Sequence, residues 1–381
     1  MRIVYPALLA VSLLVLTHCS GNSAPALLSD GILLQAEPTV DPPLPEPTAD
    51  PPTPQPTTDP PTPLPTMDPP TPQPTWTATI LALPTRTREA TPTPTPTATP
   101  SPAPTITPST GALAIPRLDL NPDEPIPYLE TFRLLTYYGS PTGRGLGILG
   151  ESARDDMTRD LCALALQLQA LSPDRFVLPT YHMVTTVADK NPGADENYSH
   201  QVDLEMLEEW IEAATENGAA AILDIQPARA DLQEEFDRIK HLLRYPHVHL
   251  ALDPEFIVSE EQIPGTNLGK IQADQINAIQ AQLNEIALEI GMNRVLIVHQ
   301  FVDSMIPDKD LLTDFAHVEL VIDADGVGGK GSKLFDYKQY ALEPGFEYGG
   351  IKVFTRHDLS PLLTLEEIMA LEPPPAIVIY Q

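Results

Sequence analysis

Two carboxylates follow an apolar run near the middle of the chain. The stretch His249–Phe256 is predicted to be a short apolar strand that ends in Asp253 and Glu255. Side chains two residues apart on a strand share a face and lie roughly 6–7 Å apart along it. Such a carboxyl pair can divide general acid and base roles, as glycosidic bond cleavage requires. We therefore select Glu255 as the candidate general acid, with Asp253 or Asp224 orienting it or stabilising a cationic transition state.

An apolar run ending in polar residues occurs eight times from residue 132 onwards. Apolar strands buried on both faces are typical of parallel sheets, and helical patterns lie between these runs. Eight sequential β–α units predict right-handed crossovers and a (β/α)8 barrel of about 250 residues. The expected fold class is thus α/β, a TIM-type barrel whose last helix is missing because the chain stops on the eighth strand. An open doubly wound sheet is the alternative.

In a barrel, the C-terminal ends of all strands meet at one rim, where the chemistry of this fold is placed. Acids crowded together there raise the pKa of at least one carboxyl, which is what a general acid requires. The alternative is that these polar residues only bind loop amides or cap helices. The predicted substrate-binding residues at the rim are Tyr138, His182, Gln226, His299, Gln300, Asp325, Lys352 and Tyr380.

Residues 1–19 have the features of an export signal. Arg2 precedes an apolar run that ends near Leu16 and is too short to span a bilayer. The segment Leu16–Cys19 resembles a bacterial lipoprotein signal, which implies lipidation of Cys19 and a membrane anchor. Cleavage after Ala26, at an A-x-A site, is the alternative and would release a secreted protein.

Residues 20–110 are dominated by Pro and Thr. A nine-residue repeat begins with Asp-Pro-Pro at Asp41, Asp50, Asp59 and Asp68. Because Pro fixes φ and removes a backbone donor, we expect a disordered, extended stalk without a core. The barrel domain then covers residues 111–381, and the apolar residues of 111–130 are candidates to cover the gap left by the missing helix.

The formal net charge is −30. A surface this acidic repels nucleic acid and anionic lipid. It favours binding of neutral or cationic partners or of divalent metal ions. We expect no nucleic-acid partner and no cofactor, and the His spacing contains no complete zinc-ligand set, so no metal site is assigned. Two G-x-G-x-x-G matches, at 145–150 and 326–331, are interpreted as rim loops, since Asp323 and Asp325 would repel a phosphate beside the second.

The ending Asp253-Pro254-Glu255 resembles the D-x-E end of the strand-four motif in chitinase-like glycoside hydrolase barrels. The resemblance covers those positions only, and Val248 and Ala251 stand where that family has further aspartates. Residues 132–381 are also similar to an uncharacterised group of secreted bacterial barrel proteins, which implies a barrel and export but no established activity. The segments that carry this similarity are Tyr137–Gly139, Leu223–Pro227, Leu252–Glu255, Val298–Phe301 and Tyr380–Gln381.

Three functions remain open at this stage. The first is an exported, stalk-tethered hydrolase of a glycan or cell-wall polymer, with Glu255 as general acid. The second is a non-catalytic module that binds a glycan or envelope polymer through the same rim. The third is a metal-dependent hydrolase that uses Asp224, Asp253 and Asp323.

Overall fold

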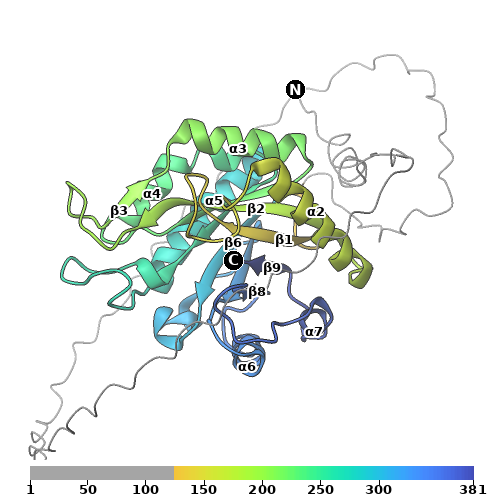
Figure 1. Cartoon of the computed structure of the whole chain (residues 1–381). Helices are drawn as coiled ribbons and strands as arrows, with labels where there is room; N and C mark the ends of the chain where they lie inside the picture. Colours follow the sequence, from red (N-terminus) through yellow and green to blue (C-terminus); the bar gives the residue numbers. More distant parts are fainter. Residues whose placement is uncertain (1–123) are drawn as a thin grey trace, which may run out of the picture. The chain divides into compact units, whose positions relative to one another are not determined.

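The computed structural model describes residues 124–381, and within them eight parallel strands close into a barrel. β1 pairs with β2 on one side and with β9 on the other, which completes the ring. Helices surround the strands (Figure 1), so the predicted TIM-type barrel is confirmed. The expectations for the signal, Cys19, the stalk and residues 111–123 lie outside the described residues. The barrel strands are β1 (Phe132–Gly139), β2 (Phe176–Ala188), β4 (Ala220–Ile225), β5 (Val248–Leu252), β6 (Arg294–Gln300), β7 (Val318–Ala324), β8 (Tyr348–Val353) and β9 (Ile377–Tyr380).

Three of the helices begin at residues whose side chains cap them. The Asp203 and Asp231 carboxylates accept hydrogen bonds from the backbone amides of Glu205 and Glu234. Thr364 and Glu367 form a reciprocal capping box at the start of the last helix. The β6–β7 connection contains the 3₁₀ helices η3 (Asp303–Met305) and η4 (Lys309–Leu311). Between residues 124 and 381, no helix is both long and apolar enough to cross a membrane. The α-helices are α2 (Arg154–Leu171), α3 (Leu204–Glu216), α4 (Leu232–Ile239), α5 (Ala273–Ile290), α6 (Lys330–Tyr340) and α7 (Leu365–Met369).

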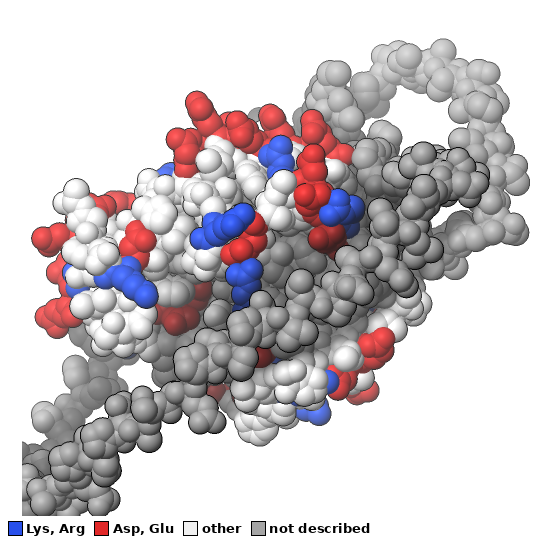
Figure 2. All heavy atoms as spheres, in the orientation of Figure 1, with Lys and Arg blue, Asp and Glu red and all other residues white. Residues whose placement is uncertain are grey.

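The outer face of α3 is strongly acidic. Figure 2 shows acidic side chains gathered over this helix, with few basic side chains among them. Its inner face carries buried Leu207, Trp210 and Ile211, so the helix has the amphipathic pattern of a barrel's outer layer. The acids therefore form a solvated face and do not belong to the rim. The exposed acids of α3 are Glu205, Glu208, Glu209, Glu212 and Glu216.

The N-terminal end of the barrel is closed by buried polar groups. The Glu319 carboxylate accepts the backbone amides of Tyr128 and Leu129 at 2.6 and 2.5 Å. The Arg294 guanidinium donates to carbonyls of the segment 243–248, while Tyr128 packs its ring on His249 at 4.1 Å. The described part of 111–130 thus covers the N-terminal ends of β5 and β7. The sequence had suggested it as a cover for the gap left by the missing helix.

One strand was not predicted. β3 (Ser199–Gln201) pairs antiparallel with the last residues of β2, from Thr186 to Ala188. These residues are the C-terminal end of β2, which at 13 residues is longer than the other strands of the barrel. The resulting hairpin projects past the rim, and its inner residue Ala188 borders the cavity described next.

Candidate active site

A cavity of about 440 Å³ lies at the C-terminal ends of the barrel strands. One part of its wall is polar and another is aromatic, a combination that suits a partly polar organic ligand. Six of the residues predicted from the sequence line it: Tyr138, Gln226, Asp253, Glu255, Asp325 and Lys352. The aromatic lining comes from Phe256, Phe301 and Phe354, and further polar lining from Ser332, Asp336 and Gln381.

Asp253 and Glu255 reach this cavity by a route that differs from the expected one. β5 ends at Leu252, and Pro254–Phe256 form a 3₁₀ helix, η2, with Asp253 at its N-cap. The two carboxylates therefore do not share a strand face, and the prediction of that geometry was wrong. Pro254 has the fixed φ that suits the first position of a helix, and it turns the chain here. Both side chains nevertheless line the same cavity.

The backbone of η2 is held by a close neighbour. The Gly269 amide donates to the Glu255 carbonyl at 2.8 Å. A Cβ at Gly269 would lie 2.4 Å from the Pro254 carbonyl oxygen and 2.6 Å from that of Glu255. Only glycine allows so close an approach of the two backbones, so this contact fixes where Glu255 stands at the rim.

A buried cation stands at one side of the cavity. Lys352 Nζ lies 3.2 Å from Asp325 Oδ2 and 3.8 Å from the centre of the Tyr138 ring. Burial alone would lower the pKa of Lys352, but Asp325, Asp253 and other carboxylates outweigh it and raise that pKa. Lys352 is therefore charged at neutral pH and partly neutralises an otherwise anionic site.

Gln226 connects two parts of the site. Its Nε2 donates to the Tyr138 hydroxyl at 2.9 Å and to Asp253 Oδ2 at 3.1 Å. The other carboxyl oxygen of Asp253, Oδ1, has no hydrogen-bond partner among the described residues. Asp253 is thus held in one orientation by an amide, with one oxygen left for a proton or a ligand.

The carboxyls of the cavity resist ionisation. Burial raises the pKa of Asp253 to about 7, with Asp224 and Asp325 adding to the effect and His299 opposing it. Burial also raises the pKa of Glu255, to which the charge of Asp325 adds and that of Lys352 subtracts. A raised pKa favours the protonated form of a carboxyl, which is the form that can donate a proton to a leaving group.

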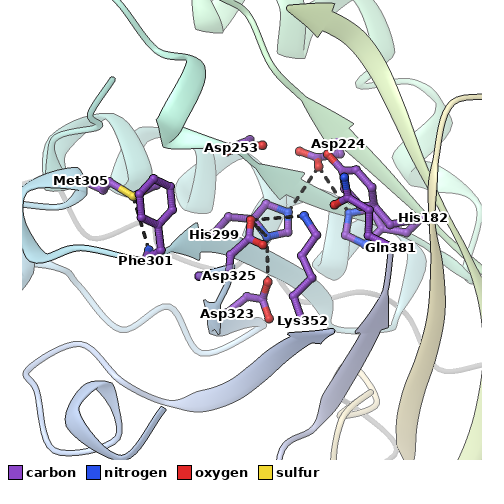
Figure 3. A network of polar contacts seen from close by, with 12 residues as sticks. His182, Asp224, Asp253, His299, Phe301, Met305, Asp323, Asp325, Lys352 and Gln381 are labelled. Atoms are coloured by element: carbon purple, nitrogen blue, oxygen red, sulfur yellow. Dashed lines mark hydrogen bonds and ion pairs between the residues drawn. The ribbon is translucent and has the colours of Figure 1, made fainter. Parts of the chain in front are cut away.

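Three of the predicted residues lie below the cavity. His182, Asp224 and His299 are fully buried and are not part of the lining. Figure 3 shows the Asp224 carboxylate directed toward the two imidazole rings, with Asp323 on the far side of His299. Asp224 therefore does not reach a ligand in the cavity, so the proposed direct role beside Glu255 is not supported by its position.

Two predicted residues stand apart from the lining. Gln300 is fully buried, and its amide donates to the Val302 carbonyl of its own loop at 3.3 Å. Tyr380 is partly buried, and burial raises its pKa to about 12. Its neighbour Gln381 lines the cavity instead and donates to the Leu146 carbonyl at 2.8 Å.

The glycine-rich loops act as parts of the rim. A Cβ at Gly147 would lie 2.2 Å from the Tyr138 carbonyl oxygen, so the first loop packs closely on β1. In the second loop, the Gly328 amide donates to the Asp358 carboxylate at 2.9 Å. Because this amide already donates its hydrogen bond to a carboxylate of the protein, the loop is not arranged to bind a phosphate, in agreement with the prediction.

Comparisons of the chain with protein families, with curated proteins and with solved structures found no match. The functional argument therefore depends on the chemistry of the cavity.

An Asp253→Asn substitution tests the raised pKa of Asp253 through protein stability. Between pH 4 and 7 the unfolded chain loses this proton while the folded chain keeps it, so wild-type stability falls across that window. The introduced amide does not titrate and can still accept a hydrogen bond from Gln226. Relative to wild type, the variant should gain stability between pH 4.5 and 8, by up to about 4 kcal/mol from a shift of this size.

Urea unfolding of both proteins at the two pH values measures this difference. The exposed Asp310 provides a control, and Asp310→Asn should show no comparable change with pH. Equal stability differences between wild type and Asp253→Asn at pH 4.5 and 8 would show that Asp253 ionises normally.

Proposed function

We propose that the protein is a glycoside hydrolase-like enzyme that cleaves a neutral or cationic glycan or cell-wall polymer by carboxylate acid and base chemistry. The observation that carries this proposal is the pair Asp253 and Glu255, which line one cavity and both have raised pKa values. Glycosidic cleavage needs a carboxylic acid that protonates the leaving oxygen and a second carboxyl on the other side of the bond.

The roles follow from the environments of the two groups. Glu255 is half-buried at the rim, where it can meet a glycosidic oxygen, so we assign it as general acid. Asp253 is deeper and oriented by Gln226, so we assign its ionised form, which predominates above its pKa of about 7, to stabilise the positive charge that develops on the sugar or to activate water. Phe256, Phe301 and Phe354 provide apolar faces for sugar rings at the same cavity.

The first 110 residues suggest where this activity takes place. A signal at residues 1–19 and a Pro/Thr-rich stalk support export, with the enzyme held at a membrane by lipidated Cys19 or secreted after cleavage. Metabolic labelling with a fatty-acid analogue tests the anchor, since a Cys19→Ala variant should lose the label.

A substrate screen tests the proposal. The purified protein is incubated with bacterial cell-wall glycans and with neutral and amino-sugar polysaccharides, and new reducing ends are measured with mass spectrometry of the products. We expect release of short oligosaccharides from at least one polymer. Binding to a glycan without any product would instead indicate the non-catalytic module.

A further inference from the structure

Three buried side chains from three different strands converge below the cavity. His182 on β2, Asp224 on β4 and His299 on β6 are each 0% exposed. Asp224 Oδ2 lies 3.5 Å from His182 Nε2 and 3.3 Å from His299 Nε2. One ligand atom from each residue lies within 4.8 Å of the others (Figure 3).

The contacts among these polar atoms do not have the geometry of hydrogen bonds. Both ring nitrogens of His182, both carboxylate oxygens of Asp224 and Nε2 of His299 have no partner with hydrogen-bond geometry among the described residues. An unpaired polar group in the interior destabilises the fold, and more strongly when it is charged. Nε2 of His182 and Nε2 of His299 lie beside the same oxygen, Asp224 Oδ2, which indicates that a further group completes the coordination of these three atoms.

A neighbouring carboxylate sets the tautomer of His299. Its Nδ1 lies 2.8 Å from Asp323 Oδ2. In the neutral imidazole, a proton on Nδ1 leaves the lone pair on Nε2, which faces the Asp224 carboxylate. Two lone pairs at 3.3 Å repel unless a cation lies between them. A carboxylate on the outer nitrogen of a histidine is also the usual support of a metal-bound imidazole.

The distances fit a small divalent ion. Tetrahedral ligands bound at about 2.0–2.1 Å stand roughly 3.3–3.4 Å from one another, close to the two observed separations. Asp253, Asp323 and Asp325 surround the three residues with Lys352 as their counter-charge, so the local charge favours a cation. Two imidazoles and one carboxylate suit zinc or a neighbouring transition metal and leave a further position open.

We propose that His182, Asp224 and His299 bind one divalent transition metal of the zinc type, with Asp323 positioning His299. This site differs from the all-aspartate set considered from the sequence, because Asp253 and Asp323 are not among its ligands. The competing explanation is a protonated His299 held between Asp224 and Asp323. That arrangement gives Asp224 one partner but leaves His182 with only the 3.5 Å contact to the same Asp224 oxygen.

Zinc binding to the full chain tests this site without any substrate. After removal of metals with EDTA and dialysis, Zn²⁺ is titrated by calorimetry and metal content is measured by mass spectrometry. We expect one Zn²⁺ per chain with Kd below about 1 μM, a higher Tm on binding, and tetrahedral ligand-field bands with Co²⁺.

Substitutions show whether Zn²⁺ binds at the three buried residues or at the acidic surface. His182→Ala should weaken zinc binding more than about 100-fold, and Asp323→Asn about 10- to 100-fold. His200 is the matched control, since it is exposed and lies 2.7 Å from Asp189 in a similar His–Asp pair; His200→Ala should leave affinity unchanged. If a variant fails to fold, the wild-type stoichiometry and Co²⁺ spectrum still decide.

Two results would overturn the proposal. One is wild-type protein that binds no stoichiometric Zn²⁺ after EDTA treatment. The other is folded His182→Ala protein that binds Zn²⁺ as tightly as wild type. Either would favour the protonated His299. Neither bears on the glycan screen, so the two proposals fail independently.

Discussion

Replacing Lys352 with Met is expected to lower the free energy of unfolding by about 3–5 kcal/mol, the usual cost of removing one partner of a buried ion pair. Lys352 and Asp325 are 2% and 7% exposed, with 3.2 Å between Nζ and Oδ2. Met retains the apolar contact with Tyr138 but leaves Asp325 without its cation. The loss is therefore electrostatic, and chemical denaturation at pH 8 measures it.

A second substitution shows whether that electrostatic origin is correct. Asp325→Asn removes the uncompensated charge, so the double variant should be more stable than the sum of the single effects predicts, by up to about 3 kcal/mol. Lys330 is the matched control, because its Nζ lies 2.6 Å from a Glu367 oxygen in a partly exposed pair. Lys330→Met should cost less than about 1 kcal/mol. Equal costs at the two lysines, or strict additivity, would contradict this account.

The barrel could be predicted because its strands are mainly apolar. A parallel strand is buried on both faces, so a run such as Val295–Val298 of β6 stands out between the polar residues Arg294 and His299. β3 gave no such signal, since Ser199–Gln201 is polar and its pairing with β2 joins residues that no local pattern connects. Local composition therefore identifies the ring of strands, whereas short polar hairpins depend on tertiary contacts.

The sequence identified many residues of the site but did not reveal their geometry. The rim argument placed Lys352 and Asp325 together correctly, since the ends of neighbouring strands must meet. It could not show that the chain leaves β5 at Leu252, although Pro254 was a usable signal. Ser332, Asp336 and Gln381 were missed because α6 and the C-terminal residue approach the cavity only in the folded barrel.

The sequence also did not show how deeply each predicted rim residue is buried. A strand end does not reveal which side chains line the cavity and which lie beneath it. His182 and Asp224 follow the same sequence pattern as Asp253, yet they meet His299 in the interior. This difference separates the residues proposed to act on a ligand from those proposed to hold a metal.

Replacing Glu255 with Gln is expected to lower kcat on a substrate found by the screen by about 10²- to 10⁴-fold, the typical contribution of a general acid. Gln keeps the size of the side chain and its place at the rim but cannot donate the proton. The raised pKa of Glu255 also predicts that wild-type activity falls as pH rises through it, since only the protonated form is the acid. The basic limb of the pH profile should therefore disappear from the residual activity of the variant.

Glu261 provides the control for this experiment, because it is an exposed glutamate in the loop that follows η2. Glu261→Gln should retain wild-type kcat and the basic limb. Asp253→Asn should lose activity comparably to Glu255→Gln, since the proposed mechanism requires both carboxyls, one on each side of the bond. Normal turnover by folded Glu255→Gln would exclude Glu255 as the acid. If Asp253→Asn alone were inactive, Asp253, whose pKa is raised to about 7, would be the proton donor instead of Glu255.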